Sequence, residues 1–142
     1  MYRNSLRATA AMLFEAVRHL KANAYENKVV IIVGSIEGIK PAPNHAAYAT
    51  MKAALHHLVM AAANELGADG IRVVAVAPGL IYRKGLENDW PEGLARWNTA
   101  APLGRPVTNE EVADAILAAA HNTALTGITI PVDAGWSANP AW

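Results

Sequence analysis

Two segments of the chain are almost continuously apolar and rich in β-branched residues. Residues 28–35 carry five of these in succession, Val29 to Val33, and residues 71–77 repeat the pattern as far as Pro78-Gly79. Runs without alternation of polar and apolar positions are typical of strands buried on both faces of a parallel sheet. A last apolar run, Ile128 to Val132, follows a Thr-Gly pair. The pattern therefore predicts three strands.

Apolar residues at helical spacing occur before the first of these strands and between the strands. Residues 46–66 predict a helix that is apolar on more than one face and ends at Gly67 and Gly70. Such a helix is expected to have protein on several sides. Residues 5–21 predict a helix with one apolar stripe, formed by Leu6, Ala10, Leu13, Phe14, Val17 and Leu20.

Two further helices are indicated by the residues at their starts. Asp89-Trp-Pro-Glu92 offers an N-cap, an early proline and a carboxylate that reaches back, which predicts a short helix. Thr108-Asn-Glu-Glu111 has the sequence of a capping box. The helix that follows it has a predicted apolar side formed by Val112, Ala113, Ile116, Leu117 and Ala120.

The predicted order of elements over the 142 residues is α-β-α-β-α-α-β. Strands that alternate with helices at this spacing form right-handed crossovers and a parallel sheet. We therefore expect an α/β fold with three parallel strands and flanking helices, which is one domain or part of one. Ligands of such sheets bind beyond the carboxyl ends of the strands, where Ser35 and Pro78-Gly79 lie.

Composition narrows the classes of function. Twelve Lys and Arg balance twelve Asp and Glu, so no net charge attracts nucleic acid or an anionic membrane. No apolar run reaches the roughly 18 residues of a membrane span, and residues 1–5 lack the basic start of a secretion signal. Cysteine is absent, which excludes thiolate catalysis and cysteine-ligated metals. We expect a cytoplasmic protein that binds neither nucleic acid nor membrane.

Tyr48 and Lys52 stand four residues apart near the start of the 46–66 helix, so their side chains project from one face. The lysine ammonium favours the phenolate form of the tyrosine, which suits proton exchange with an alcohol or carbonyl oxygen. Ser35, at the end of the preceding strand, adds a hydroxyl within reach of the same oxygen. Taken singly, such a Tyr/Lys pair is common on solvated helix faces, and a serine after a strand is usually a turn residue.

Three motifs occur together in order. They are Gly34-Ser35-Ile-Glu-Gly38, then Tyr48-Ala-Thr-Met-Lys52 with the serine thirteen residues before the tyrosine, then Val76-Ala-Pro78-Gly79-Leu-Ile81. In this combination the chain resembles the short-chain dehydrogenase/reductase family. Further segments are similar to the family's C-terminal part, namely Pro102-Leu-Gly-Arg105, Thr126-Gly127 and Val132-Asp133-Ala-Gly135. The resemblance runs across nearly the whole chain.

The resemblance implies part of a doubly wound, Rossmann-like parallel sheet and an oxidoreductase that uses NAD or NADP. It implies that Tyr48 is the general acid and base, that Lys52 favours the phenolate and holds the nicotinamide ribose, and that Ser35 orients the substrate carbonyl. The nicotinamide pocket would be lined by Pro78, Gly79 and Ile81.

Two positions depart from the family's pattern. Arg83 stands where the family usually has a threonine shortly after Pro-Gly, although a cation there could meet a phosphate. The family's fourth catalytic residue is an asparagine on the helix before the serine strand, and Asn4 and Ser5 both align with it. Asn4 is equally well explained as a helix N-cap.

The Gly-rich turn of the family's cofactor-binding half has no counterpart in this sequence. That turn needs glycines two residues apart, and no two of the ten glycines have this spacing. Residues 1–142 therefore correspond to the family's C-terminal, catalytic half, a partial domain whose first strand would be an unpaired edge. We expect a second chain, or residues beyond this sequence, to complete the sheet and supply the nucleotide-binding half.

The remaining histidines and aromatic residues support weaker interpretations. His56 and His57 are adjacent on a helix and point about 100° apart, so they cannot chelate one ion, and no metal site is expected. We expect packing or surface positions for them. Trp90 and Trp97 form either a lid over the substrate or part of the core. Together with Tyr82 they favour an apolar or aromatic substrate.

Two functions are compatible with these observations. The first is a reductase or dehydrogenase subunit that is active once a cofactor-binding half is supplied. The second is a non-catalytic assembly subunit, or a degenerate fragment, that keeps only the scaffold. In either case the Ala-rich helices at 5–21 and 46–66 permit close approach and would form the contact of a homo- or hetero-oligomer.

Overall fold

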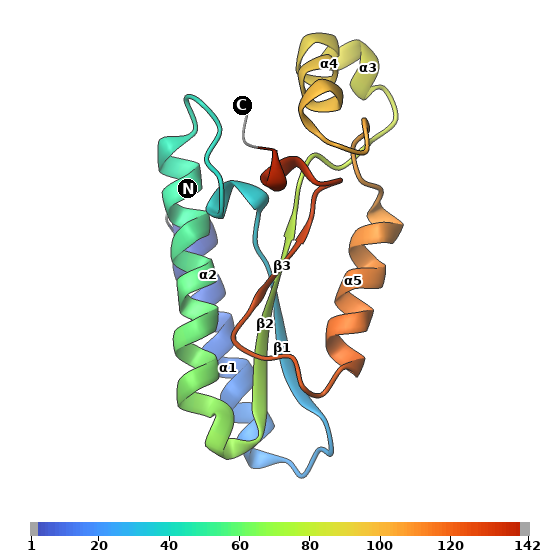
Figure 1. The fold of residues 1–142 in the computed structure, drawn as a ribbon. Helices are drawn as coiled ribbons and strands as arrows, with labels where there is room; N and C mark the ends of the chain where they lie inside the picture. The colour runs from blue at the N-terminus through green and yellow to red at the C-terminus, as the bar shows by residue number, and fades with distance from the viewer. Residues whose placement is uncertain (1–2, 140–142) are drawn as a thin grey trace.

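The computed structural model describes residues 3–139, and the side chains of residues 5–139. Three parallel strands, β1 (Lys28–Val33), β2 (Ile71–Pro78) and β3 (Thr129–Val132), form one sheet in the order β1-β2-β3. Figure 1 shows their arrows pointing towards the same end of the molecule. The predicted α/β fold with three parallel strands and flanking helices is confirmed.

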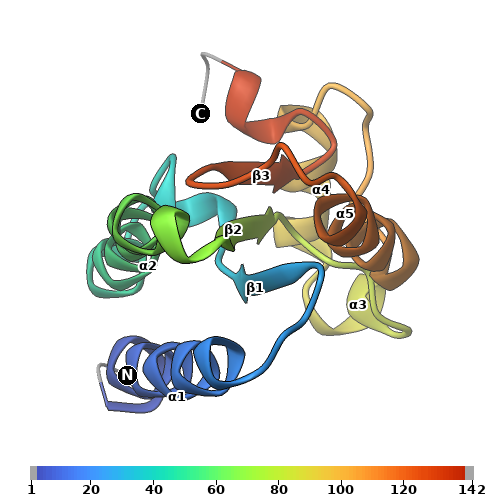
Figure 2. The same ribbon diagram turned by 90° about the horizontal axis from the view of Figure 1, so that it is seen from below.

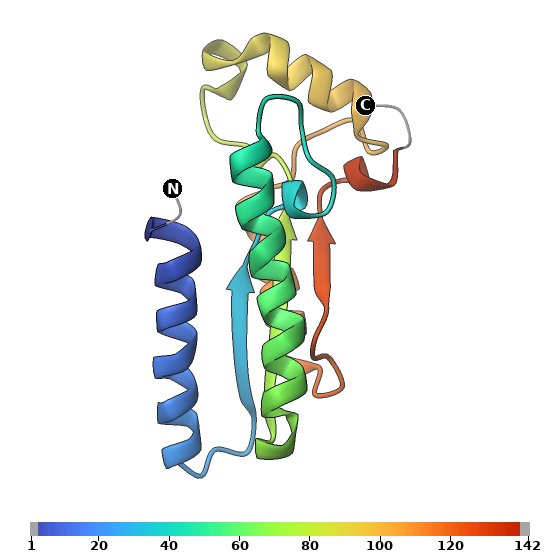
Figure 3. The ribbon, with the colours of Figure 1, turned by 90° about the vertical axis from the view of Figure 1, so that its left-hand side faces the viewer.

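Helices cover both faces of the sheet. α1 (Ala8–Ala22) and α2 (Ala46–Leu66) lie on one face and α5 (Asn109–His121) lies on the other (Figure 2). A π-helical turn, η1 (Arg3–Arg7), precedes α1, and Figure 3 shows α1 alongside β1. The short α3 (Leu86–Asp89) and α4 (Pro91–Ala100) lie beyond the carboxyl ends of the strands, in Figure 1 at the top. The described residues also include three 3-10 turns, namely η2 (Ile36–Gly38), η3 (Gly67–Asp69) and η4 (Trp136–Ala138).

The core on the side of α1 and α2 joins both helices to the sheet. Leu13 and Val17 of α1 and Val59 of α2 are buried together with strand residues. The predicted stripe is therefore confirmed at Leu13 and Val17 but wrong at Phe14, which is 64% exposed. One step along a helix turns the side chain by about 100°, which carries Phe14 away from the sheet.

The two long strands differ in burial because they differ in their neighbours. All eight residues of β2 are buried, since β2 is paired on both sides and covered on both faces. Within the described residues β1 pairs with β2 alone, and Ile32 is its one buried side chain. The prediction of a strand buried on both faces is thus wrong for β1, whereas its unpaired edge is as expected.

The two predicted helix starts have different outcomes. The capping box is confirmed, because Thr108 Oγ1 accepts from the Glu111 N–H at 3.2 Å and Glu111 Oε2 accepts from the Thr108 N–H at 2.9 Å. The N-cap at Asp89 is wrong: Asp89 belongs to α3 and pairs with Arg83 at 2.6 Å, while Trp90 precedes α4.

The predicted apolar side of α5 is confirmed at Val112 and Ile116, which lie in or against the core, and is wrong at Ala113 and Leu117. Ala113 and Leu117 are exposed, whereas Val112 and Ala119 are buried. The buried positions follow the spacing of one helix face, and in an Ala-rich helix the sequence offers several such faces.

One cation is buried within β2. Arg72 is 9% exposed, and its guanidinium donates to the carbonyl oxygens of Ala119, Ala120, Asn122 and Leu125 and to Asn27 Oδ1. Two of these oxygens, those of Ala119 and Ala120, belong to the last turn of α5, whose carbonyls have no partner within the helix and carry its negative dipole end. Arg72 therefore fastens the end of α5 to the middle strand.

Candidate active site

Ser35 leaves β1 in extended conformation and begins the turn η2. Its Oγ accepts a hydrogen bond from the Glu37 N–H at 3.2 Å, and the residue is 8% exposed. Because this bond uses the oxygen as an acceptor, the hydroxyl proton of Ser35 is left to donate to another group.

Tyr48 and Lys52 lie one turn apart on α2 and face the loop that contains Ser35. Lys52 Nζ donates to the carbonyl oxygen of Gly34 at 3.0 Å and lies 5.7 Å from the centroid of the Tyr48 ring. Burial lowers the pKa of Lys52 from its ordinary value of 10.5. An ammonium has three donors, so this one holds the strand end and keeps donors for a ligand.

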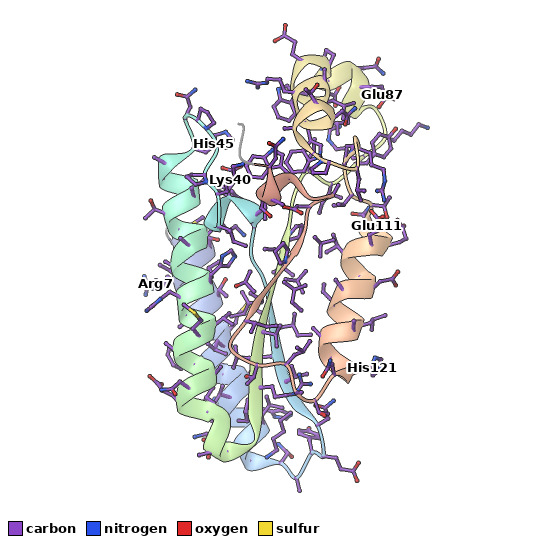
Figure 4. The ribbon with its side chains drawn as sticks, in the orientation of Figure 1. Arg7, Lys40, His45, Glu87, Glu111 and His121 are labelled. Atoms are coloured by element: carbon purple, nitrogen blue, oxygen red, sulfur yellow. The ribbon has the colours of Figure 1, made fainter. Side chains whose placement is uncertain are left out.

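A pocket of about 260 Å³ opens beside Ser35 and Tyr48. Its other lining residues are Ile36, Glu37, Ala42, His45, Gly79, Leu80, Trp90, Trp97 and Trp136. Figure 4 shows His45 and Lys40 beside the loop that leads into α2, at the end of the molecule where α3 and α4 lie. The structure thus brings two of the three predicted catalytic side chains to one pocket, with Lys52 directly behind Tyr48.

The predicted cofactor-binding residues do not all reach this pocket. Gly79 lines it, but Pro78 and Ile81 do not. Pro78 ends β2 in register with Val132, and Ile81 forms an isolated bridge with Val107. Gly79 has no room for a side chain, because a Cβ there would lie 2.6 Å from Trp97 Cη2.

His56 is buried, as a packing residue was expected to be, but sequence reasoning did not place it against the loop of Ser35. It follows Lys52 by one turn of α2 and is 8% exposed. A Cβ on Gly34 would lie 2.3 Å from its Nε2, and a Cβ on Gly38 would lie 2.6 Å from its Cε1. The imidazole therefore packs against Gly34 and Gly38, one on each side of Ser35, and leaves no room for a side chain at either position. The signal in the sequence was a histidine four residues after Lys52 together with glycines on both sides of Ser35.

Burial and the nearby charge of Lys52 lower the pKa of His56 from its ordinary value of 6.5. His56 Nε2 has no hydrogen-bond partner among the described residues. A neutral imidazole at this position leaves Lys52 as the cation of the site.

The tryptophans divide between the two predicted roles. Trp97 is 7% exposed and stacks on Trp136 with ring centroids 5.3 Å apart and planes 5° apart, so it belongs to the core. Trp90 is 46% exposed and forms an outer wall of the pocket.

Neither Arg83 nor Ser5 is among the described residues that line this pocket. Arg83 is exposed and forms its ion pair with Asp89. The side chain of Asn4 lies outside the described residues, and Ser5 is partly buried in η1.

Among the side chains that the structure describes, no cluster of His, Asp or Glu suits a metal ion. The described helices include none that is long and apolar enough to cross a membrane.

Comparison with known proteins identifies the family. A family model described as enoyl-(acyl carrier protein) reductase matches residues 1–137. Glucose 1-dehydrogenase of Gluconobacter oxydans is 36% identical over 126 residues, which cover 85% of this chain and 47% of that protein. The chain belongs to the short-chain dehydrogenase/reductase family. It spans about half the length of the curated relatives it matches.

Solved structures of this family have the same fold. A short-chain type dehydrogenase/reductase from Mycobacterium ulcerans superposes with a TM-score of 0.85 at 26% identity, over 95% of this chain and 50% of that one. A small-chain dehydrogenase in complex with NADPH gives a TM-score of 0.73 at 25% identity, over 86% of this chain and 57% of that one.

Proposed function

We propose that this chain carries the proton-transfer residues of an NAD(P)-dependent oxidoreductase that interconverts a carbonyl compound and an alcohol. The observation that carries the proposal is the placement of Lys52 between Gly34 O and the Tyr48 ring, with Ser35 and Tyr48 lining one pocket. The family membership of the chain supports the same class of reaction.

In the reductive direction, the Tyr48 hydroxyl donates its proton to the substrate oxygen, and Ser35 donates a hydrogen bond to the same oxygen. The ammonium of Lys52 stabilises the phenolate that remains on Tyr48. In the oxidative direction the phenolate takes the alcohol proton back. The hydride at the carbonyl carbon would come from, or pass to, a nicotinamide cofactor when one is bound.

The residues present fit the nicotinamide end of such a cofactor. Lys52 is a partly buried ammonium that bonds Gly34 O and keeps donors for ribose hydroxyls. We propose that Pro78, Gly79 and Ile81, at the end of β2 and in the segment after it, flank the ring. The pyrophosphate end needs a Gly-rich turn, which no glycine spacing in this sequence provides.

The nucleotide-binding half is therefore proposed to come from a second chain or from residues beyond this sequence. The free edge of β1 supports this part of the proposal. A groove of about 360 Å³ follows that edge between α1 and β1, lined by Thr9, Met12, Leu13, Ala16 and residues 30–33. An apolar strand edge of this kind pairs readily with another strand.

Contacts between copies are proposed to use α1 and α2. Phe14 of α1 and Met60 of α2 are 64% and 49% exposed, and burying them in an oligomer would remove apolar surface from water. Analytical ultracentrifugation of Phe14→Glu against Lys84→Glu, an exposed position elsewhere, tests this contact. Dissociation in the first variant alone is expected.

A non-catalytic assembly subunit is the second candidate. It is favoured by the lack of a Gly-rich turn in the sequence and by the ion pair that ties Arg83 to Asp89. Such a subunit would keep its fold and its contacts when Tyr48 loses its hydroxyl, and the assembly would keep its full activity.

Native mass spectrometry of the protein isolated from its source, followed by titration with NADH and NADPH, tests the proposal. We expect the 142-residue sequence to be present with a nucleotide-binding half, in the same or a second chain, and to bind one of the two cofactors. A folded protein of this sequence alone that binds neither cofactor would favour the scaffold function.

A further inference from the structure

We propose that the pocket beside Ser35 selects uncharged carbonyl compounds with a compact apolar body and rejects those that carry a carboxylate or phosphate on that body. This inference rests on the proposed function and names its substrate class. It follows from the aromatic wall of the pocket and from the single carboxylate that lines it.

The apolar wall is held firmly in place. Trp97 stacks on Trp136 and donates from Nε1 to the carbonyl oxygen of Arg105 at 3.1 Å. Trp90 packs against Gly93, where a Cβ would lie 1.8 Å from the indole ring. Rigid aromatic surfaces favour planar or compact apolar ligands, because such ligands bury apolar area without ordering the protein further.

The carboxylate of Glu37 is the group that we expect to disfavour anionic substrates. Its carboxylate lines the pocket two residues beyond Ser35, its side chain is 19% exposed, and both oxygens lie within 3.0 Å of His45 Nδ1. No Lys or Arg is among the described residues that line this pocket. A substrate anion would meet the like charge of Glu37, whose ion-pair partner is His45 and beside which the pocket lining offers no Lys or Arg. An uncharged hydroxyl of a substrate can instead donate to Glu37.

Three cations lie near this pocket, but none of them is among its described lining residues. Lys52 lies 5.7 Å from the centroid of the Tyr48 ring and donates to the carbonyl oxygen of Gly34. Arg96 lines a neighbouring hollow that shares His45, Trp90 and Trp97. Lys40 donates to the carbonyl oxygen of Asn139 and lies 5.2 Å from the centroid of the Trp136 ring. An anionic ligand would have to reach into that neighbouring hollow to meet Arg96.

The test compares two ligands of similar shape. The full chain is titrated with 4-methylcyclohexanone and with 4-oxocyclohexanecarboxylate, and binding is followed through the indole N–H resonances of the pocket tryptophans. This readout needs no turnover, so a failure of the proposed reaction and a failure of this inference are distinguishable. We expect the uncharged ketone to shift these resonances and the carboxylate to bind about tenfold or more weakly.

Two variants assign the effect to Glu37. Glu37→Gln keeps the shape of the side chain and is expected to remove most of the difference between the two ligands. Glu87→Gln, whose carboxylate lies on the exposed α3 and accepts from Tyr82 at 3.3 Å, is the matched control and is expected to preserve it. Equal affinity for both ligands, tighter binding of the carboxylate, or no binding of either would overturn the inference.

Discussion

The carbonyl oxygen of Gly34 accepts a hydrogen bond from Lys52 Nζ at 3.0 Å, and the same ammonium lies 5.7 Å from the centroid of the Tyr48 ring. The end of β1 thereby fixes a cation next to the phenol one turn away on α2. Ser35 follows Gly34 directly, so one short segment positions both the hydroxyl and the cation of the candidate site.

Replacing Lys52 by Gln is expected to lower kcat by about 100-fold or more, because a neutral amide stabilises the Tyr48 phenolate poorly. Steady-state kinetics of the assembled enzyme give this value. Lys84→Gln removes an exposed lysine outside the pocket and is the control. Activity of Lys52→Gln within a few-fold of the unmodified enzyme would show that the ammonium has no catalytic part.

His56 is expected to make the stability of the fold depend on pH below neutrality. Its pKa is lowered in the folded chain, so between that value and 6.5 the unfolded chain binds more protons. Stability therefore falls as the pH falls through this window. In His56→Leu this fall should be smaller, as measured by urea unfolding at pH 7.5 and at about pH 5.

His57→Leu is the matched control for this effect. His57 is the next residue on α2 and is exposed, so its variant should retain the pH dependence. The same pH dependence in both variants would mean that His56 is not its source.

Replacing Arg72 by Met is expected to destabilise the fold by about 3 kcal/mol, because the end of α5 loses its buried donor and several carbonyls are left without a partner. Urea unfolding measures the change. Arg18→Met removes a largely exposed arginine that pairs with Glu15, and it should cost less than about 0.5 kcal/mol. Equal losses would argue against a special role of Arg72.

Glu111 is expected to contribute to acid unfolding. Hydrogen bonds from Arg105 and from the Thr108 N–H lower the pKa of its carboxyl to about 2. The unfolded chain binds more protons between that value and the ordinary 4.5, so this stabilisation is present above 4.5 and is lost as the pH falls towards 2. Circular dichroism during acid titration should show a shallower loss in Glu111→Gln. Glu65→Gln, at an exposed position on α2, should match the unmodified chain.

Local signals in the sequence predicted much of the fold and part of the site. The capping box of Thr108 and Glu111 was predictable because both partners lie within one turn. Ser35 and Tyr48 were expected to share a site because a strand and the helix after it meet at one edge of the sheet, and both line the pocket.

Features that depend on distant contacts were not predictable. The sequence pattern does not decide which side of the Ala-rich α5 faces the sheet, because several faces are equally apolar, and Ala113 and Leu117 are exposed. The partners of Arg72 lie 45 to 53 residues away in the chain. Asp89 has the sequence of a cap but pairs with Arg83 instead.

Tyr48→Phe tests the central claim most directly, because it removes one hydroxyl and leaves the ring in place. The measurement is NAD(P)H-dependent reduction of an uncharged ketone by the assembled protein, with native mass spectrometry to confirm that assembly is unchanged. We predict that kcat falls by about 100-fold or more while the mass of the assembly stays the same. Unchanged turnover in a correctly assembled Tyr48→Phe protein would contradict the proposed role of this chain in the reaction.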